Sequence, residues 1–202
     1  MMGVVAGQAA VDRSVELLRG ACAAEGMPVV VAAIDGIGGA GKSTLAARIA
    51  HLLERVSVIH TDDFASWEDP VGWWPRLLSQ VLRPLADGRP ARYQRYDWER
   101  QALAEWHEVP VTDYLLIEGV GSSRREFRPY LAVSVWVATG REECLQRGLA
   151  RDGAQARDLW VAWQAAEDDY IADHEPERAA DLIVSGENGS PWEGPQRPDK
   201  SV

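Results

Sequence analysis

The residues best suited to chemistry in this chain lie in a glycine-rich run that ends in a lysine. Residues 36–43 read GIGGAGKS, which fits the spacing G-x-x-x-x-G-K-[ST], and they follow the apolar run VVVAAI at 29–34. Glycines allow backbone N–H groups to turn inward and approach a polyphosphate closely. A helix that begins where the run ends would add the positive end of its dipole. The pattern therefore predicts a phosphate-binding loop between a strand and a helix.

This loop also predicts ATP and Mg²⁺ as cofactors. Lys42 would supply a mobile cation for the β- and γ-phosphates, and the Ser43 hydroxyl is placed to hold Mg²⁺. Because Asn188 is the single asparagine, the chain lacks the N-K-x-D motif that reads guanine, and we expect ATP to be preferred over GTP. The residues expected to bind the nucleotide are Gly36, Gly38, Gly39, Ala40, Gly41, Lys42, Ser43 and Thr44.

Two adjacent carboxylates follow the next apolar run. The segment VSVIH at 56–60 continues as TDDF, which places Asp62 and Asp63 just past the carboxyl end of a predicted strand. In open parallel sheets the ligand crevice lies outside that edge, and a carboxylate there can accept a proton from an attacking hydroxyl. Neighbouring residues near a strand end point to opposite faces. We therefore expect one of the two to face the loop and the other to cap the following turn.

The elements that must position these residues follow from the apolar pattern. Strands are predicted at residues 29–34, 56–60, 113–119, 132–138 and 180–186. Helices are predicted at residues 9–24, 42–54, 74–88, 142–151 and 155–173. Apolar strands that alternate with helices indicate a parallel sheet covered on both faces. We expect an α/β fold of the P-loop NTPase type, with a five-stranded parallel sheet, helices on both faces and a small helical lid.

The composition limits the classes of partner. The chain has 202 residues, 46% of them hydrophobic, and a net charge of −10. This length suits a single domain at 1–186 with a lid near 147–158, followed by a flexible tail at 187–202. The acidic total argues against DNA or RNA as the main partner. The longest apolar run is too short for a bilayer and the N-terminus lacks a basic signal-peptide start, so we expect a cytoplasmic protein without a membrane partner. A homo-oligomer stays open.

Several short segments together resemble the uridine kinase and phosphoribulokinase group of P-loop kinases. They are GIGGAGKST, TDDF, WEDPVGWW, RYDW, LLIEGV and the GLARD–ARD segment, spread over about residues 29–186. The resemblance implies a kinase that transfers the γ-phosphate of ATP to a hydroxyl of a small molecule, with a nucleoside as the leading acceptor. It also implies that Asp62, followed by Phe64 in the family's D-x-F pattern, orients and deprotonates that hydroxyl.

The resemblance assigns further roles outside the loop. Glu118 ends the LLIEG strand beside the loop, where it could bind Mg²⁺ or brace the loop by hydrogen bonds. A sugar hydroxyl would be held by Glu68 or Asp69, and the base would pack on Tyr96, with the neighbouring Trp98 also suited to stacking.

Three arginines are expected to form the lid. Arg147 and Arg151 lie four residues apart on one predicted helix, where they can close over the triphosphate and neutralise the charge that develops during transfer. Arg157 matches the family's second lid arginine, which approaches the acceptor. The family's first lid arginine falls on Gly148 in this chain, which is a departure from the pattern.

The identity of the acceptor stays open in the sequence. The histidine that reads the pyrimidine in uridine kinases is missing after residues 96–98, where this chain has Glu99, Arg100 and Gln101. A nucleoside monophosphate or a vitamin alcohol is therefore an alternative acceptor. The arginines available for a monophosphate are Arg76, Arg83, Arg89, Arg92, Arg95 and Arg100. A non-catalytic ATP-binding sensor is the alternative from another class.

Overall fold

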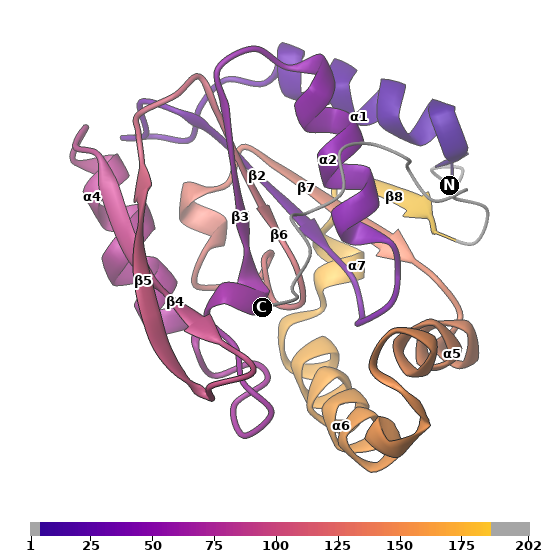
Figure 1. Cartoon of the computed structure of the whole chain (residues 1–202). Helices are drawn as coiled ribbons and strands as arrows, with labels where there is room; N and C mark the ends of the chain where they lie inside the picture. Colours follow the sequence, from indigo (N-terminus) through magenta and orange to yellow (C-terminus); the bar gives the residue numbers. More distant parts are fainter. Residues whose placement is uncertain (1–4, 187–202) are drawn as a thin grey trace.

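A parallel β-sheet forms the centre of the computed structural model, which describes residues 5–186 (Figure 1). The strands lie in the order β1-β8-β7-β2-β6-β3, and all neighbours pair in parallel. Their bounds are β1 Val5–Ala6, β2 Val30–Asp35, β3 Val56–His60, β6 Tyr114–Glu118, β7 Val133–Ala138 and β8 Leu182–Ser185. The five predicted strands are confirmed, and the short β1 extends the sheet at one edge. The predicted tail at 187–202 lies outside the described residues.

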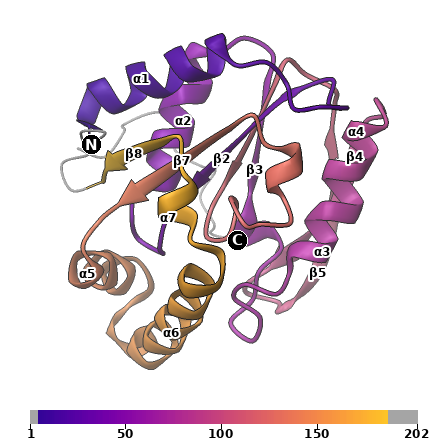
Figure 2. The ribbon, with the colours of Figure 1, turned by 180° about the vertical axis from the view of Figure 1, so that it is seen from behind.

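Helices cover both faces of this sheet, as predicted (Figures 1 and 2). Their bounds are α1 Gly7–Gly20, α2 Lys42–Leu52, α3 Trp74–Leu77, α4 Arg83–Ala86, α5 Arg141–Asp152, α6 Arg157–His174 and α7 Pro176–Ala179. A π-helical turn, Leu78–Leu82, joins α3 to α4, so the two run on as the single helix expected there. Within residues 5–186, no helix combines the length and the apolar character needed to cross a membrane.

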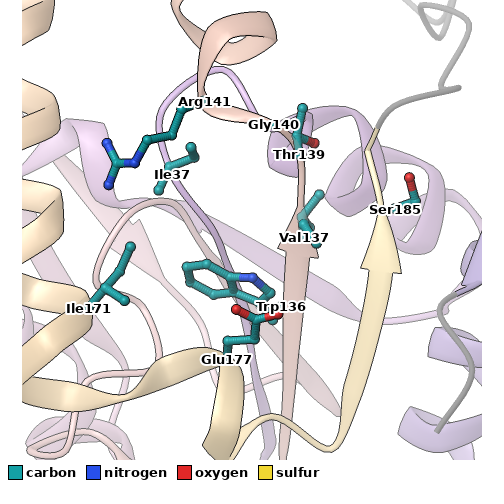
Figure 3. A pocket seen from close by; sticks show the side chains of 10 residues that line it. Ile37, Trp136, Val137, Thr139, Gly140, Arg141, Ile171, Glu177 and Ser185 are labelled. Carbon is teal, nitrogen blue, oxygen red and sulfur yellow. The ribbon is translucent and has the colours of Figure 1, made fainter.

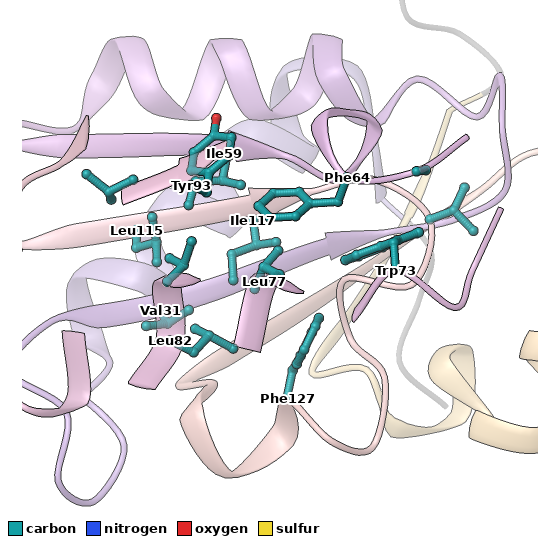
Figure 4. Packing of buried hydrophobic residues seen from close by; sticks show 14 of the residues in the cluster. Val31, Ile59, Phe64, Trp73, Leu77, Leu82, Tyr93, Leu115, Ile117 and Phe127 are labelled. Atoms are coloured by element: carbon teal, nitrogen blue, oxygen red, sulfur yellow. The ribbon is translucent and has the colours of Figure 1, made fainter. Parts of the chain in front are cut away.

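Two apolar clusters hold the helices against the sheet. Because side chains alternate along a strand, Val31 of β2 joins the cluster under α3 and α4, while Ile34 joins the cluster under α1 and α2. β6 divides in the same way, with Ile117 in the first cluster and Leu116 in the second. Figure 4 shows the first cluster, with Phe127 at the bottom of the view and its ring centroid 6.3 Å from that of Trp73. Each such side chain, fully buried, stabilises the fold by about 1.5–3 kcal/mol.

An antiparallel hairpin, which the sequence analysis did not predict, lies beside the parallel sheet. It consists of β4, Ala91–Asp97, and β5, Ala102–Val109. Only Ala91, Tyr93 and Val109 of its two strands are buried, so the apolar pattern that marks the other strands is weak here. Tyr93 stacks on Phe64 with ring centroids 4.8 Å apart (Figure 4), and the hairpin thereby packs against the turn that follows β3.

Candidate active site

A cavity of about 1290 Å³ lies at the carboxyl ends of the central strands, between the glycine-rich loop and helices α5 and α6. Its lining brings together Lys42, Asp62 and Glu118, which come from three separate elements. β2 lies between β6 and β7, and the chain leaves it into the loop, so the cavity occupies the crevice where parallel sheets bind ligands. The loop residues that line the cavity are Gly38, Gly39, Gly41, Lys42, Ser43 and Thr44.

The glycine-rich loop has a shape that side chains would prevent. Gly39 has φ +84°, and a Cβ on it would lie 2.5 Å from the Cys144 carbonyl oxygen. Gly41, at φ +100°, is the N-cap of α2, so the first N–H groups of that helix are left without intrahelical partners beside the cavity. Lys42 is 7% exposed, and its Nζ donates to the Ile37 carbonyl at 2.8 Å. These residues fit a triphosphate, because the first N–H groups of a helix and a lysine meet beside glycines that leave room for the phosphates.

Asp35 fixes the start of this loop, and the sequence analysis missed it. It ends β2, is fully buried, and accepts hydrogen bonds from Gly36 N at 2.7 Å and Tyr170 Oη at 2.6 Å. Ser123, which follows β6, donates to the same carboxylate from N at 2.9 Å and from Oγ at 2.7 Å. Burial, together with the charge and hydrogen bond of Asp35, raises the pKa of Tyr170 well above its usual value. One carboxylate therefore ties the loop to the segment after β6 and to α6.

The two adjacent aspartates have different surroundings. Both lie on a short 3₁₀ turn, Thr61–Asp63, and Asp62 faces the cavity. The Asp63 carboxylate instead accepts a hydrogen bond from Tyr93 Oη at 2.7 Å. The surrounding protein partly desolvates the Asp62 carboxylate, and this desolvation, followed by the charge of Glu118, raises the pKa of Asp62. The positive charges of Lys42 and Arg151 oppose this change. Asp62 therefore has the position predicted for the general base, and the role itself stays a prediction.

Glu118 lies next to the loop, where Mg²⁺ is expected. It is buried at the end of β6, and its carboxylate pairs with His60. Burial alone would raise the pKa of Glu118, but His60, Lys42 and Ser43 outweigh it and keep the pKa below its usual value. Among residues 5–186 there is no cluster of three or more His, Cys, Asp or Glu side chains able to hold a metal. A hydroxyl and a carboxylate fit Mg²⁺, which takes its other ligands from water and phosphates.

Four indole rings form an aromatic wall of the cavity, and one of them, Trp160, also packs against Gly38 of the loop. Trp67, Trp98, Trp160 and Trp163 meet edge to face or tilted, with centroids 5.5–6.4 Å apart. Three of their N–H groups are already bonded: Trp98 to Asp62 O, Trp160 to Asp152 Oδ2, and Trp163 to Glu167 Oε1. The indoles therefore present mainly ring carbon to a ligand. Trp160 and Trp163 were not predicted to line a site, although their spacing places both on one face of a helix.

Two of the predicted lid arginines line the cavity. Arg147 donates to the carbonyl oxygens of Gly39 at 3.2 Å and Gly186 at 2.9 Å, and it pairs with Glu143. Arg151 forms two hydrogen bonds with Asp152, at 2.8 and 2.9 Å, and its guanidinium lies 5.5 Å from the Trp160 ring centroid.

The other predicted site residues lie outside the cavity lining in this structure. Asp69 accepts from Gly72 N at 2.6 Å and so closes its own turn, while Glu68 is exposed. Tyr96 meets the lining residue Trp98 edge to face, with ring centroids 5.6 Å apart, and Arg157 is exposed at the start of α6. Of the loop residues, Gly36 and Ala40 are not part of the lining. The substrate-binding roles of these residues stay predictions.

Trp160 explains why glycine occupies the position of the family's first lid arginine. The indole of Trp160 packs against Gly148, where a Cβ would lie 2.5 Å from the ring. The same ring lies 2.8 Å from where a Cβ on Gly38 would be. A side chain at position 148 would therefore displace Trp160 from both α5 and the phosphate loop.

We expect Gly148→Ala to lower the free energy of unfolding by about 1–3 kcal/mol, because the added methyl group overpacks the site against Trp160. Chemical denaturation of the two proteins measures this difference. Gly20→Ala is the matched control, since a Cβ there has no neighbour within 4 Å and stability should stay the same or rise slightly. Equal stability of the two variants would contradict this packing argument.

A second pocket, of about 400 Å³, lies behind the phosphate loop (Figure 3). Trp136 of β7 lies at its centre, between Ile37 of the loop and Glu177 of α7. None of the predicted site residues lines this pocket.

Comparison with known sequences gives a partial match. No model of a known protein family matches the chain. Inorganic pyrophosphatase TTM1 of Arabidopsis thaliana is 25% identical over 134 residues, which cover 61% of this chain and 21% of that protein. Inorganic pyrophosphatase TTM2 of the same plant is also 25% identical over 134 residues. The chain thus spans about a fifth of the length of these curated relatives.

Comparison with solved structures establishes the fold. A possible uridine kinase from Bacillus stearothermophilus superposes with a TM-score of 0.67 and 24% identity, covering 88% of this chain and 98% of that chain. A candidate fructose transport system kinase from Silicibacter sp. TM1040 gives a TM-score of 0.57 and 21% identity, covering 87% and 97%. The fold is therefore that of uridine kinase-like P-loop kinases, in agreement with the resemblance seen in the sequence.

Proposed function

We propose that this protein is an ATP- and Mg²⁺-dependent kinase that transfers the γ-phosphate to a hydroxyl group of a small molecule. The observation that carries this proposal is the cavity in which Lys42, Ser43 and Glu118 lie on the phosphate side and Asp62 faces the same space. A phosphate cradle alone would serve a switch or a sensor equally well. A kinase also needs a group that can take the proton of the acceptor hydroxyl and a surface that can bind the acceptor. Asp62 can serve as the first and the aromatic wall as the second.

Different residues of the cavity have different roles in phosphoryl transfer. The loop amides and Lys42 hold the phosphates, and Arg147 and Arg151 neutralise charge on the transferring group. Asp62 holds the acceptor hydroxyl and takes its proton while the hydroxyl oxygen bonds to the γ-phosphorus and the bond from that phosphorus to the bridging oxygen breaks, releasing ADP. Mg²⁺, held by Ser43 and Glu118, would supply additional positive charge at the phosphates.

The acceptor side of the cavity favours an uncharged molecule over a nucleoside monophosphate. Among residues 5–186, the cations that line the cavity are Lys42, Arg48, Arg147 and Arg151, and all belong to α2 or α5. The six arginines between 76 and 100 are absent from the lining. Arg76, for example, donates to the Phe64 carbonyl. A nucleoside stays the leading acceptor, because indole rings stack on flat bases, and a vitamin alcohol is the alternative.

An ATP-consumption screen tests this proposal. We expect ADP formation to rise above the background rate with at least one nucleoside or vitamin alcohol, and the corresponding monophosphates to be poorer acceptors. Tight ATP binding without turnover on any hydroxyl compound would instead favour a nucleotide sensor. A preference for monophosphates would show that arginines outside the cavity lining move into it.

A further inference from the structure

One face of α6 lies against the phosphate loop. Trp160, Trp163, Glu167 and Tyr170 recur every three or four residues, so they share this face, and all four are buried. The Tyr170 hydroxyl reaches Asp35 at the start of the loop, and the Trp160 ring packs against Gly38. Glu167, between them, is the one carboxylate on this face.

Glu167 connects the two sides of the cavity through one oxygen atom. Its Oε1 accepts a hydrogen bond from Gly38 N at 2.6 Å and another from Trp163 Nε1 at 2.7 Å. Gly38 lines the cavity on the phosphate side, and Trp163 lines it on the aromatic side. Glu167 itself is fully buried and does not line the cavity. It therefore acts on a ligand only through these two neighbours.

A buried carboxylate lowers the stability of the fold unless its interactions compensate, so a purely structural role does not explain why it is at this position. The second oxygen, Oε2, is buried and has no hydrogen-bond partner within the described residues. Burial also raises the pKa of Glu167, which reflects the cost of keeping a charge there. Well-packed apolar groups often stabilise such a site better than a buried charge. What the carboxylate offers is an acceptor strong enough to hold two N–H donors, one from the phosphate loop and one from the aromatic wall.

We propose that Glu167 is a positioning residue that fixes Gly38 of the phosphate loop and Trp163 of the aromatic wall relative to each other. The triphosphate and the acceptor are thereby held at a set separation. Such fixed geometry matters because a displacement of about 1 Å between reacting groups can cost about 10²-fold in rate. The expected effect of Glu167 on catalysis rests on the proposed kinase function. The expected effect of Glu167 on nucleotide binding requires only that the protein binds ATP.

The test compares variants that keep or remove the shared acceptor. Glu167→Gln keeps an oxygen that can accept both N–H groups, and Glu167→Leu removes it. Trp163→Phe removes one donor and leaves the carboxylate in place. Asp169→Asn is the matched control, because it removes a charge from an exposed position on the same helix. Thermal denaturation of each variant verifies that it is folded.

ATP affinity measured without any acceptor is the first readout. We expect Glu167→Leu to weaken ATP binding about tenfold, since a freed loop must be ordered when it binds ATP. The ATP affinities of Glu167→Gln and Asp169→Asn should equal that of the wild type within the error of the measurement. Trp163→Phe should weaken ATP binding about threefold in the wild-type background but not in the Glu167→Leu background. This non-additivity in ATP affinity, in variants that remain folded, is the signature of an effect of Trp163 on ATP binding that passes through Glu167.

The outcomes separate this inference from the proposed function. If the wild-type protein does not bind ATP, the proposed function fails. If it binds ATP and Trp163→Phe has the same effect with and without Glu167, the inference is overturned. Tighter binding by both Glu167→Gln and Glu167→Leu would also overturn it, because the carboxylate would then merely repel the phosphates.

If Glu167→Leu does not fold, the Glu167→Gln and Trp163→Phe arms decide, with the same expected results. With an acceptor present, kcat should fall about 10²-fold in Glu167→Leu and be rescued in Glu167→Gln.

Discussion

Replacement of Asp62 by Asn is expected to lower kcat by about 10²–10⁴-fold, which is the usual contribution of general-base catalysis. Asp62 faces the cavity opposite Lys42 and Arg151, and an amide in its place cannot accept a proton from the acceptor hydroxyl. ATP affinity should stay nearly unchanged, because the phosphates are held by the loop and not by this side chain. Steady-state kinetics and equilibrium ATP binding on the same preparation separate these two effects.

Asp63→Asn is the matched control for this experiment. The Asp63 carboxylate accepts a hydrogen bond from Tyr93, and an Asn side chain keeps an oxygen that can do the same. We therefore expect little change in kcat and at most a small loss of stability. An inactive Asp63→Asn protein beside an active Asp62→Asn protein would mean that the catalytic carboxylate is the other one of the pair.

Lys42→Ala is expected to remove ATP binding and turnover together. Lys42 is the buried cation of the phosphate loop, and without it the β- and γ-phosphates lose their main charged partner. Equilibrium binding of ATP measures the effect, with thermal denaturation as a check that the loop change has not unfolded the protein. If ATP affinity stays within about threefold of the wild type, the loop is not used in the way we describe.

The central sheet and the phosphate loop could be predicted because their signals are local. The five predicted strands are confirmed, since each is a short run rich in apolar residues, and β2 and β6 at the centre of the sheet are almost wholly buried. The loop is recognisable because its glycines adopt backbone angles that other residues resist. The position of Asp62 also follows from a local cue, the end of β3.

Other features depend on residues that are distant in the sequence. Asp35 and Tyr170 are 135 positions apart, and Gly38 and Glu167 are 129 apart, so no local pattern announces either contact. The β4–β5 hairpin was missed because only Ala91, Tyr93 and Val109 of its two strands are buried, so it lacks the apolar run that marks the other strands. The packing of Trp160 against Gly148 likewise appears only when α5 and α6 are placed together.

Four residues whose roles were assigned by resemblance to the kinase group do not line this cavity. Glu68, Asp69, Tyr96 and Arg157 were assigned by resemblance, and each lies outside the lining. Asp69 shows why, because its carboxylate is engaged by Gly72 within its own turn. In contrast, the tryptophans of α6 line the same cavity as Asp62, and their three-residue spacing on one face of that helix could have pointed to them.

The most direct test of the central claim is a phosphate balance in a reaction with ATP, Mg²⁺ and the best acceptor from the screen. Mass spectrometry measures the phosphorylated acceptor, and parallel assays measure ADP and free phosphate. Inorganic pyrophosphate serves as a second substrate, because the curated relatives are named as inorganic pyrophosphatases. We predict one phosphorylated acceptor for each ADP, little free phosphate, and no cleavage of pyrophosphate. Free phosphate equal to the ADP formed, or phosphate released from pyrophosphate, would contradict the assignment of this protein as a kinase.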